Sequence, residues 1–288
     1  MFVKDNSIES AKGYFQERLT SLFSETEIKS MWKQLICKRF EWSKTDFLLV
    51  KDFKLSESDL LYVRSFVKRL QSNEPFQYIL GETSFYNLTI QCDKRALIPR
   101  PETEELVSWI AETNSPAKIL DICSGSGCIA LALKSVFKNS LVFGLDISND
   151  ANELAKSNAL KNKLDVTFEL ADALNSSHFF WNSVSEIDVI VSNPPYIAHY
   201  EKAEMSQNVL KYEPHLALFV EHESPIIFYE RIAELAWLKL NKKGHLFFEL
   251  NPLYSQQIQE IVSEIGFVNI ELRKDLQGKT RMLKAQKA

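Results

Sequence analysis

Apolar residues in the first part of the chain recur at helical spacing. Between residues 28 and 36 they stand at i, i+3, i+4, i+7 and i+8, namely Ile28, Met31, Trp32, Leu35 and Ile36, which is one apolar face of a helix. A second stripe over residues 60–70 follows Ser56, a candidate N-cap, with Asp59 at the third helical position. Residues 1–73 contain one glycine and no proline, so they are predicted to form a small helical bundle.

The pattern changes over residues 74–98, which we interpret as a linker. Two short runs, Ser84-Phe-Tyr and Leu88-Thr-Ile, flank Asn87 and predict a β-hairpin. The sequence Ile98-Pro-Arg-Pro-Glu then interrupts regular structure and leads into a helix. Acidic residues occupy the first turn of that helix, where the helix dipole favours negative charge.

Strands and helices alternate after Pro116. Buried strands are expected at residues 118–122, 141–145, 166–170, 187–191 and 245–250. Residues 267–272 and 281–284 can form a terminal antiparallel pair. This alternation predicts an α/β fold over residues 99–288: a Rossmann-like, mostly parallel sheet with helices on both faces. Ligands of such sheets bind at the carboxyl ends of the strands.

The helix expected before the fifth of these strands has a clear start signal in the sequence. Ser224 is a candidate N-cap and Pro225 would occupy the first helical position. Gly244 would follow the end of the helix.

The loop after the first of these strands, Cys123–Gly127, carries the pattern Gly125-x-Gly127-x-x-Ala130. Its glycines allow a tight turn and close approach of a ligand to the backbone, and the following helix offers free N–H groups. Asp146, 19 residues after Gly127 and at the end of the second strand, can accept hydrogen bonds from both hydroxyls of a ribose. The pattern alone leaves NAD and another adenosine-bearing cofactor open.

The loop after the fourth strand reads Asn193-Pro-Pro-Tyr196. Prolines cannot donate to a sheet, so the strand must end there and nearby carbonyls become fixed in direction. The side-chain carbonyl of Asn193, the backbone carbonyl of Pro194 and the ring of Tyr196 suit a planar –NH2 group. No histidine is placed for dehydrogenase chemistry, so transfer to an amino group is the favoured interpretation.

The two loops and Asp146 resemble class I S-adenosylmethionine-dependent methyltransferases that act on amino groups. More narrowly, the segments at residues 77–82, 85–86, 98–104 and 212–219 resemble the HemK family of peptide chain release factor glutamine methyltransferases. The match runs from about Glu74 to the C-terminus, and the helical bundle fits the family's layout. The resemblance implies methylation of the side-chain amide nitrogen of the glutamine in the Gly-Gly-Gln motif of release factors, with S-adenosylhomocysteine as the other product.

The resemblance also assigns site residues. Around S-adenosylmethionine it places Cys123, Ser124, Gly125, Ser126, Gly127, Asp146, Asp172, Ala173 and Asn193. Around the acceptor glutamine it places Asn193, Pro194, Pro195 and Tyr196, with Asn193, Pro194 and Tyr196 as the catalytic set. Further candidates for the acceptor side are Tyr86, Pro101, Glu102 and Tyr212.

One position departs from the family pattern, because Cys123 stands where the first glycine of the Gly-x-Gly-x-Gly loop is usual. Cysteine is expected to require φ below zero, which would shift the loop slightly. The two glycines nearest the helix remain.

Composition narrows the alternatives. The chain of 288 residues is 45% hydrophobic and 25% charged, which excludes disorder as a description of the whole. A net charge of −4 and only a slight positive excess in residues 1–73 argue against an adenine N6 methyltransferase of DNA. Methylation of a ribosomal-protein glutamine and a non-catalytic S-adenosylmethionine- or NAD-binding role also remain as alternatives.

Cysteine spacing and the N-terminus indicate the cellular setting. The four cysteines form no C-x-x-C pair and the histidines do not cluster with them, so neither a metal site nor a disulfide framework is expected. No leader-like or membrane-spanning apolar run occurs in the sequence. A cytoplasmic protein is therefore expected, with release factors as partners, no direct contact with nucleic acid and no membrane.

Overall fold

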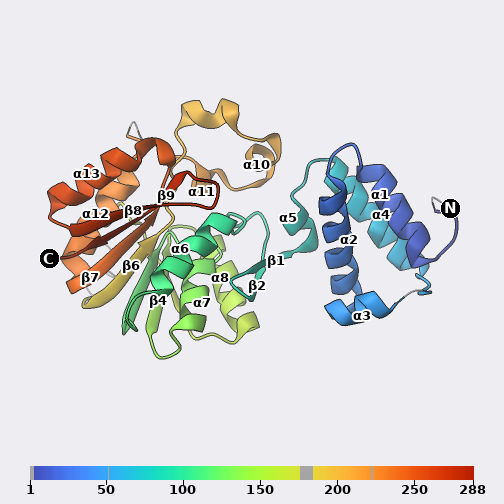
Figure 1. The fold of residues 1–288 in the computed structure, drawn as a ribbon, viewed down its shortest axis with the longest axis horizontal. Coiled ribbons are helices and arrows are strands. Elements are labelled where there is room, and N and C mark those ends of the chain that lie inside the picture. The colour runs from blue at the N-terminus through green and yellow to red at the C-terminus, as the bar shows by residue number, and fades with distance from the viewer. Residues whose placement is uncertain (1–2, 51, 176–183, 221, 223) are drawn as a thin grey trace. The chain divides into compact units, whose positions relative to one another are not determined.

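A computed structural model describes residues 3–50, 52–175, 184–220, 222 and 224–288. Contacts divide the chain into two units (Figure 1). One comprises Met1–Gly81 with Gln207–Tyr212, and the other comprises Glu82–Ser206 with Glu213–Ala288. The first is called the helical unit and the second the sheet unit.

The helical unit is built from short helices around an aromatic core, as its apolar spacing predicts. Its helices are α1 (Ile8–Leu19), α2 (Glu25–Phe40), α3 (Lys44–Leu49), α4 (Glu57–Gln71), α5 (Phe76–Leu80) and α10 (Gln207–Tyr212). The predicted N-cap is confirmed, because Ser56 and Asp59 form a reciprocal capping box at the start of α4. The ring of Phe15 is fully buried between Trp32 and Phe66, at centroid distances of 5.4 and 6.5 Å.

A β-hairpin opens the sheet unit. Strands β1 (Glu82–Phe85) and β2 (Leu88–Gln91) pair antiparallel, as predicted. Tyr86 and Asn87 between them have φ values of 47° and 64°, which is the backbone of a type I′ turn. The amide N–H of Gln91 donates to the side chain of Asn158 at 2.7 Å, so the hairpin is anchored to α8 (Asn149–Asn162).

The main sheet has seven strands in the order β5-β4-β3-β6-β7-β9-β8. They are β3 (Lys118–Ile122), β4 (Leu141–Asp146), β5 (Thr167–Leu170), β6 (Ile187–Ser192), β7 (Leu240–Glu249), β8 (Val268–Lys274) and β9 (Thr280–Gln286). Strands β3 to β7 are parallel and β9 is antiparallel to both of its neighbours. The predicted fold class, including the antiparallel terminal pair, is confirmed.

Helices cover both faces of this sheet (Figure 1). One layer contains α6 (Pro101–Ala111), α7 (Cys128–Val136) and α8, and the other contains α12 (Ile227–Lys239) and α13 (Ser255–Ile265). The shorter helices η1 (His199–Glu204), α11 (His215–Leu218) and η2 (Pro252–Tyr254) lie in the connections. Within the described residues, none of the helices is both long enough and apolar enough to cross a membrane.

The boundaries of α12 and β7 differ from the sequence prediction. Helix α12 begins at Ile227, so Ser224 and Pro225 precede it and do not cap it. Strand β7 begins at Leu240, which pairs with Ile187 across a register shift. Gly244 therefore lies inside the strand, where a Cβ atom would stand 2.9 Å from the carbonyl oxygen of Asn241. The close approach of backbone atoms at this irregular pairing requires a glycine. Gly244 therefore serves the strand and does not mark the end of a helix.

Candidate active site

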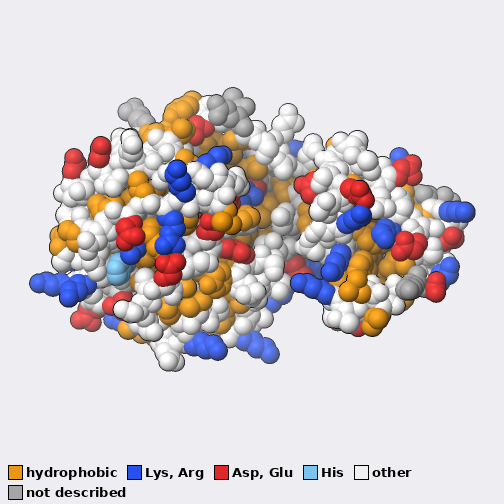
Figure 2. All heavy atoms as spheres, viewed as in Figure 1, with side chains coloured by type: hydrophobic (Ala, Val, Ile, Leu, Met, Phe, Trp, Pro, Cys, Tyr) orange, Lys and Arg blue, Asp and Glu red, His pale blue; other side chains and the backbone are white. Residues whose placement is uncertain are grey.

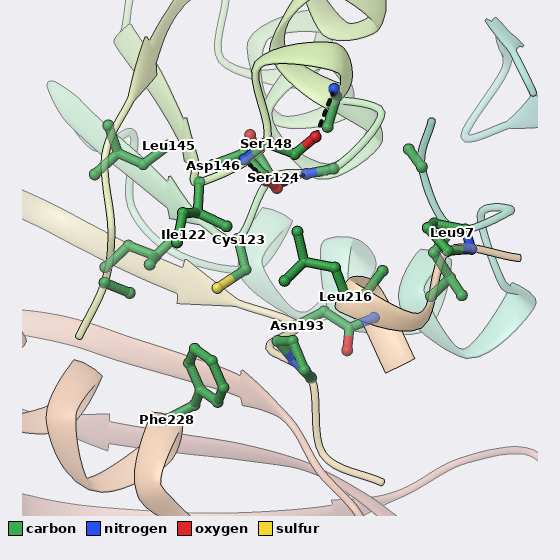
Figure 3. Close-up of a pocket in the computed structure, with 18 of the residues that line it drawn as sticks. Leu97, Ile122, Cys123, Ser124, Leu145, Asp146, Ser148, Asn193, Leu216 and Phe228 are labelled. Atoms are coloured by element: carbon green, nitrogen blue, oxygen red, sulfur yellow. Dashed lines mark hydrogen bonds between the residues drawn. The ribbon is translucent and has the colours of Figure 1, made fainter. Parts of the chain in front are cut away.

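A pocket of about 310 Å³ opens at the carboxyl ends of the parallel strands, and every residue that lines it belongs to the sheet unit. In Figure 3, Ser124, Asp146 and Ser148 lie on one side of the pocket and Phe228 on the other, with Cys123 and Asn193 between them. This size falls within the range of small-molecule sites in proteins. The position is the one that the order of strands predicts for a ligand.

The loop Cys123–Gly127 has an unusual backbone, and its residues 123–126 line the pocket. Cys123, Gly125 and Gly127 all adopt positive φ, at 62°, 53° and 77°. The amide of Ser124 donates to the carbonyl of Leu145 at 2.8 Å, which ties the loop to β4. A Cβ atom on Gly127 would lie 2.7 Å from the ring of Phe168, so this glycine is required for packing as well as for the turn.

The expectation that Cys123 would hold φ below zero is wrong. The residue takes a left-handed conformation, the region that glycine adopts most easily, and the hydrogen bond donated by the next amide, that of Ser124, keeps the loop in place. A side chain in this region costs about 1–2 kcal/mol, which the surrounding packing must offset. Burial raises the pKa of the Cys123 thiol, so the sulfur faces its neighbours as a neutral group.

Asp146 ends β4 and points its carboxylate toward the loop. Its Oδ2 accepts from the amide of Gly125 at 2.8 Å and its Oδ1 accepts from the amide of Ser148 at 2.9 Å. Burial raises the pKa of Asp146, although these backbone hydrogen bonds favour the ionised form. Each oxygen keeps further acceptor capacity, so the carboxylate can still accept hydrogen bonds from two ligand hydroxyls.

A second carboxylate, that of Asp172, lines the pocket after β5. Its Oδ1 accepts from the amide of Leu174 at 2.8 Å. Apolar side chains of Ile122, Leu145 and Ile147 line the same pocket. The hydroxyl of Ser124 is buried and has no hydrogen-bond partner among the described residues, as is common where a ligand completes a site. These residues fit an adenosine cofactor.

The Asn193–Tyr196 loop borders the pocket after β6. Asn193 and Pro195 line it, whereas Pro194 and Tyr196 do not. The side chain of Asn251 donates to the carbonyl of Tyr196 at 3.1 Å, which fixes the end of the loop. Within the part of the chain that the structure describes, the carbonyl of Pro194 accepts no hydrogen bond.

Most of the predicted site residues come together in this pocket. Those that line it are Cys123, Ser124, Gly125, Ser126, Asp146, Asp172, Ala173, Asn193 and Pro195. Predicted residues that do not line it are Gly127, Pro194, Tyr196 and the further candidates Tyr86, Pro101, Glu102 and Tyr212. The hydroxyl of Tyr212 instead donates to the carbonyl of Ser72 at 2.9 Å, within the helical unit.

Several buried polar residues around the pocket were not predicted from the sequence. Glu213 accepts from the guanidinium of Arg100 at 2.6 Å and from the amide of Ile98 at 3.1 Å. Glu249 accepts from the hydroxyl of Thr103 at 2.6 Å. Thr103 and Glu213 lie inside the family-like segments 98–104 and 212–219, so those motifs contained the signal. Glu249 had only its position at the carboxyl end of β7 to indicate it.

Two family models match the chain. "Methyltransferase small domain" matches residues 101–216, which contain both loops of the pocket. "PrmC N-terminal domain" matches residues 14–81, most of the helical unit.

Curated relatives match nearly the whole chain. A release factor glutamine methyltransferase from Flavobacterium psychrophilum is 40% identical over 96% of this chain and 98% of its own length. One from Bacteroides thetaiotaomicron is 37% identical over 95% of this chain and 98% of its own length.

Solved structures support the fold. A methyltransferase from Pyrococcus furiosus has a TM-score of 0.52 at 19% identity, covering 70% of this chain and 89% of that one. A 16S rRNA N2 G1207 methyltransferase from T. thermophilus, in complex with AdoMet and guanosine, has a TM-score of 0.50 at 16% identity, covering 72% and 50%. The identity to relatives over almost the full length of both chains is decisive: this chain belongs to the family of release factor glutamine methyltransferases.

Proposed function

We propose that this protein transfers a methyl group from S-adenosylmethionine to the side-chain amide nitrogen of the glutamine in the Gly-Gly-Gln motif of peptide chain release factors. The observation that carries the proposal is the position of Asn193. Its half-buried carboxamide lines the same pocket as Asp146 and the glycine loop. The names of the curated relatives support the same reaction.

The cofactor side of the pocket is assigned first. Asp146 would accept the ribose hydroxyls, Asp172 would accept the adenine amino group, and the loop Cys123–Gly127 would hold the amino-acid end. When bound, S-adenosylmethionine supplies an electrophilic methyl group on a positively charged sulfur. The neutral thiol of Cys123 and the apolar side chains of Ile122 and Leu145 make this end of the pocket apolar, which would favour a step in which positive charge is neutralised.

The acceptor side must overcome the weak nucleophilicity of an amide nitrogen, whose lone pair is delocalised into its carbonyl. Asn193 Oδ1 and the carbonyl of Pro194 can each accept one hydrogen of the glutamine –NH2 group. Two such bonds hold the nitrogen in one orientation and direct its lone pair toward the methyl group. Positioning of this kind supplies the main catalytic effect, and no strong base is required before transfer.

Tyr196 acts as a neutral aromatic platform in this scheme. Burial raises the pKa of its phenol, so it stays protonated at neutral pH. Its hydroxyl donates toward Glu249 Oε1 at 3.4 Å, which turns the polar end of the side chain away from the pocket. The ring packs partly against the core of the sheet unit, and its remaining surface would contact the planar amide of the substrate.

The helical unit is proposed to dock the release factor. On the face that Figure 2 shows, its acidic and basic side chains are interspersed, with no patch of one sign. A surface of that kind suits a folded protein partner better than the phosphates of nucleic acid. We also propose a cytoplasmic setting, because the substrate belongs to translation, and we expect neither nucleic acid nor a membrane as a partner.

One incubation tests the proposal against methylation of adenine in DNA, which the Asn-Pro-Pro-Tyr sequence also allows. The protein is mixed with radiolabelled S-adenosylmethionine and, separately, a release factor, duplex DNA, and a release factor whose Gly-Gly-Gln glutamine is replaced by asparagine. Label is expected on the native release factor alone. Label on DNA, or equal label on the asparagine control, would contradict the proposal.

A further inference from the structure

Three polar side chains from distant segments form a line that runs from the pocket into the core. Asn193 Nδ2 donates to Thr103 Oγ1 at 3.5 Å, and Thr103 Oγ1 donates to Glu249 Oε2 at 2.6 Å. Thr103 and Glu249 are each 2% exposed. Thr103 lines the pocket beside Asn193, whereas Glu249 lies behind it and does not line the pocket.

The direction of these hydrogen bonds is fixed by the carboxylate at the inner end. An ionised carboxylate only accepts, and a hydroxyl has a single hydrogen, so Thr103 must donate to Glu249. The lone pairs of the threonine oxygen then face Asn193, which can approach only with its –NH2 group. Burial raises the pKa of Glu249, while the hydrogen bonds from Thr103 and Tyr196 and the charge of Arg281 favour the ionised form, and it is in this form that the direction holds.

This direction decides which end of the Asn193 carboxamide is left for a substrate. Its Nδ2 is engaged by Thr103, and its Oδ1 makes no hydrogen bond among the described residues. A carboxamide rotated by half a turn would present –NH2 to the –NH2 of a glutamine, and two donors cannot bond. The contact of 3.5 Å is long for a hydrogen bond, so its effect on the rate of methyl transfer should be modest.

We propose that Thr103 and Glu249 are positioning residues that hold the carboxamide of Asn193 with its oxygen toward the acceptor. This rests on the proposed role of Asn193 in binding the glutamine –NH2 group. Neither residue touches the reacting atoms. The effect of Thr103 passes through Asn193, so it should appear in the rate of methyl transfer and be absent when Asn193 has lost its side chain; Glu249 also accepts from the hydroxyl of Tyr196, so the test is made on Thr103.

The simpler alternative is that Thr103 serves only to satisfy the buried carboxylate of Glu249. Removal of the hydroxyl would then destabilise the protein, because a buried charge would lose a partner. It would not, however, single out the chemical step. The two roles therefore differ in what they predict for kcat at saturating substrate once folding is accounted for.

The first experiment compares Thr103→Val, which keeps the shape and removes the hydroxyl, with Thr103→Ser, which keeps the hydroxyl. Single-turnover methyl transfer to a release factor is measured with S-adenosylmethionine affinity by calorimetry. Thr103→Val is expected to lower the transfer rate by about 3- to 10-fold, the equivalent of one neutral hydrogen bond. Cofactor affinity should stay at the native value, and Thr103→Ser should restore most of the rate.

The second experiment places the same change in the Asn193→Ala background, as a double-mutant cycle. The loss caused by Thr103→Val should disappear there, because no carboxamide is left to orient. Equal losses in both backgrounds, or a native rate for Thr103→Val, would overturn the proposal.

A second variant guards against loss of the fold. Thr103→Val combined with Glu249→Gln removes the threonine hydroxyl and the buried charge, and the amide oxygen of glutamine can still accept from the hydroxyl of Tyr196, so no unpaired buried charge is left. Its transfer rate should match that of Thr103→Val, and a native rate would overturn the proposal. Failure of the proposed function would be recognised by a different result: the native protein itself would transfer no methyl group to release factor glutamine.

Discussion

Replacement of Asp146 by alanine should weaken S-adenosylmethionine binding and also loosen the glycine loop. The native carboxylate accepts from the amides of Gly125 and Ser148, at 2.8 and 2.9 Å. Its remaining acceptor capacity is proposed to hold the ribose. Loss of an ionised acceptor costs about 1–3 kcal/mol, so the affinity should fall by about 5- to 150-fold.

The same change should lower stability, since two backbone N–H groups lose their acceptor. The expected cost is about 1–3 kcal/mol. The buried charge is itself unfavourable in the native protein, because burial raises the pKa of Asp146. Its removal by the substitution therefore offsets part of this cost. Asp146→Asn is the matched control, because it keeps the size and one acceptor oxygen but cannot accept from both amides.

Calorimetric titration with S-adenosylmethionine and thermal unfolding of the three proteins separate the two effects. The asparagine variant should lie between native and alanine in both measurements. An alanine variant that binds the cofactor with native affinity would refute the assignment of Asp146 to the ribose. An alanine variant that binds weakly but unfolds at the native temperature would show that the backbone hydrogen bonds contribute little.

Three further predictions follow from the same site. The ionised form of Asp146 is the one proposed to bind the ribose, and burial raises the pKa of this carboxyl. On acidification, S-adenosylmethionine affinity should therefore begin to fall at a higher pH than it would with an aspartate of ordinary pKa. Calorimetric titrations at a series of pH values check this. Cys123→Val should lower stability by about 1–3 kcal/mol, since a β-branched side chain tolerates positive φ poorly, whereas Cys123→Gly should stay near native in thermal unfolding. Deletion of residues 1–73 should reduce methylation of an intact release factor far more than that of a short glutamine peptide; equal losses would show that these residues only stabilise the fold.

The sequence was informative for most features that depend on neighbours along the chain, although the local start signal at Ser224 and Pro225 did not mark the start of α12. Apolar spacing and turn residues predicted the helical bundle, the hairpin around Asn87 and the order of strands and helices. The carboxyl-end rule then brought Asp146 and Asn193, which are far apart in sequence, to one pocket. These features follow from local periodicity and from one general property of parallel sheets.

Features set by distant partners could not be predicted. The positive φ of Cys123 depends on how the loop packs against β4, not on its neighbours in sequence. The early start of β7 depends on pairing with Ile187. The hydrogen bond between Thr103 and Glu249 joins residues 146 positions apart, and no spacing rule connects them. A buried polar pair of this kind becomes visible only when the fold is known.

Single-turnover methyl transfer by Asn193→Ala, measured with S-adenosylmethionine affinity, tests the central claim most directly. Alanine removes the proposed acceptor and leaves the glutamine nitrogen free to rotate. Transfer to the release factor should fall by about 10²–10³-fold, as when one preorganised polar contact is removed from other active sites. Cofactor affinity should change much less, because Asp146 and the glycine loop remain. Asn193→Asp keeps an acceptor of the same size and should retain more activity than alanine. A transfer rate for Asn193→Ala close to that of the native protein would contradict the account and reduce Asn193 to a turn residue.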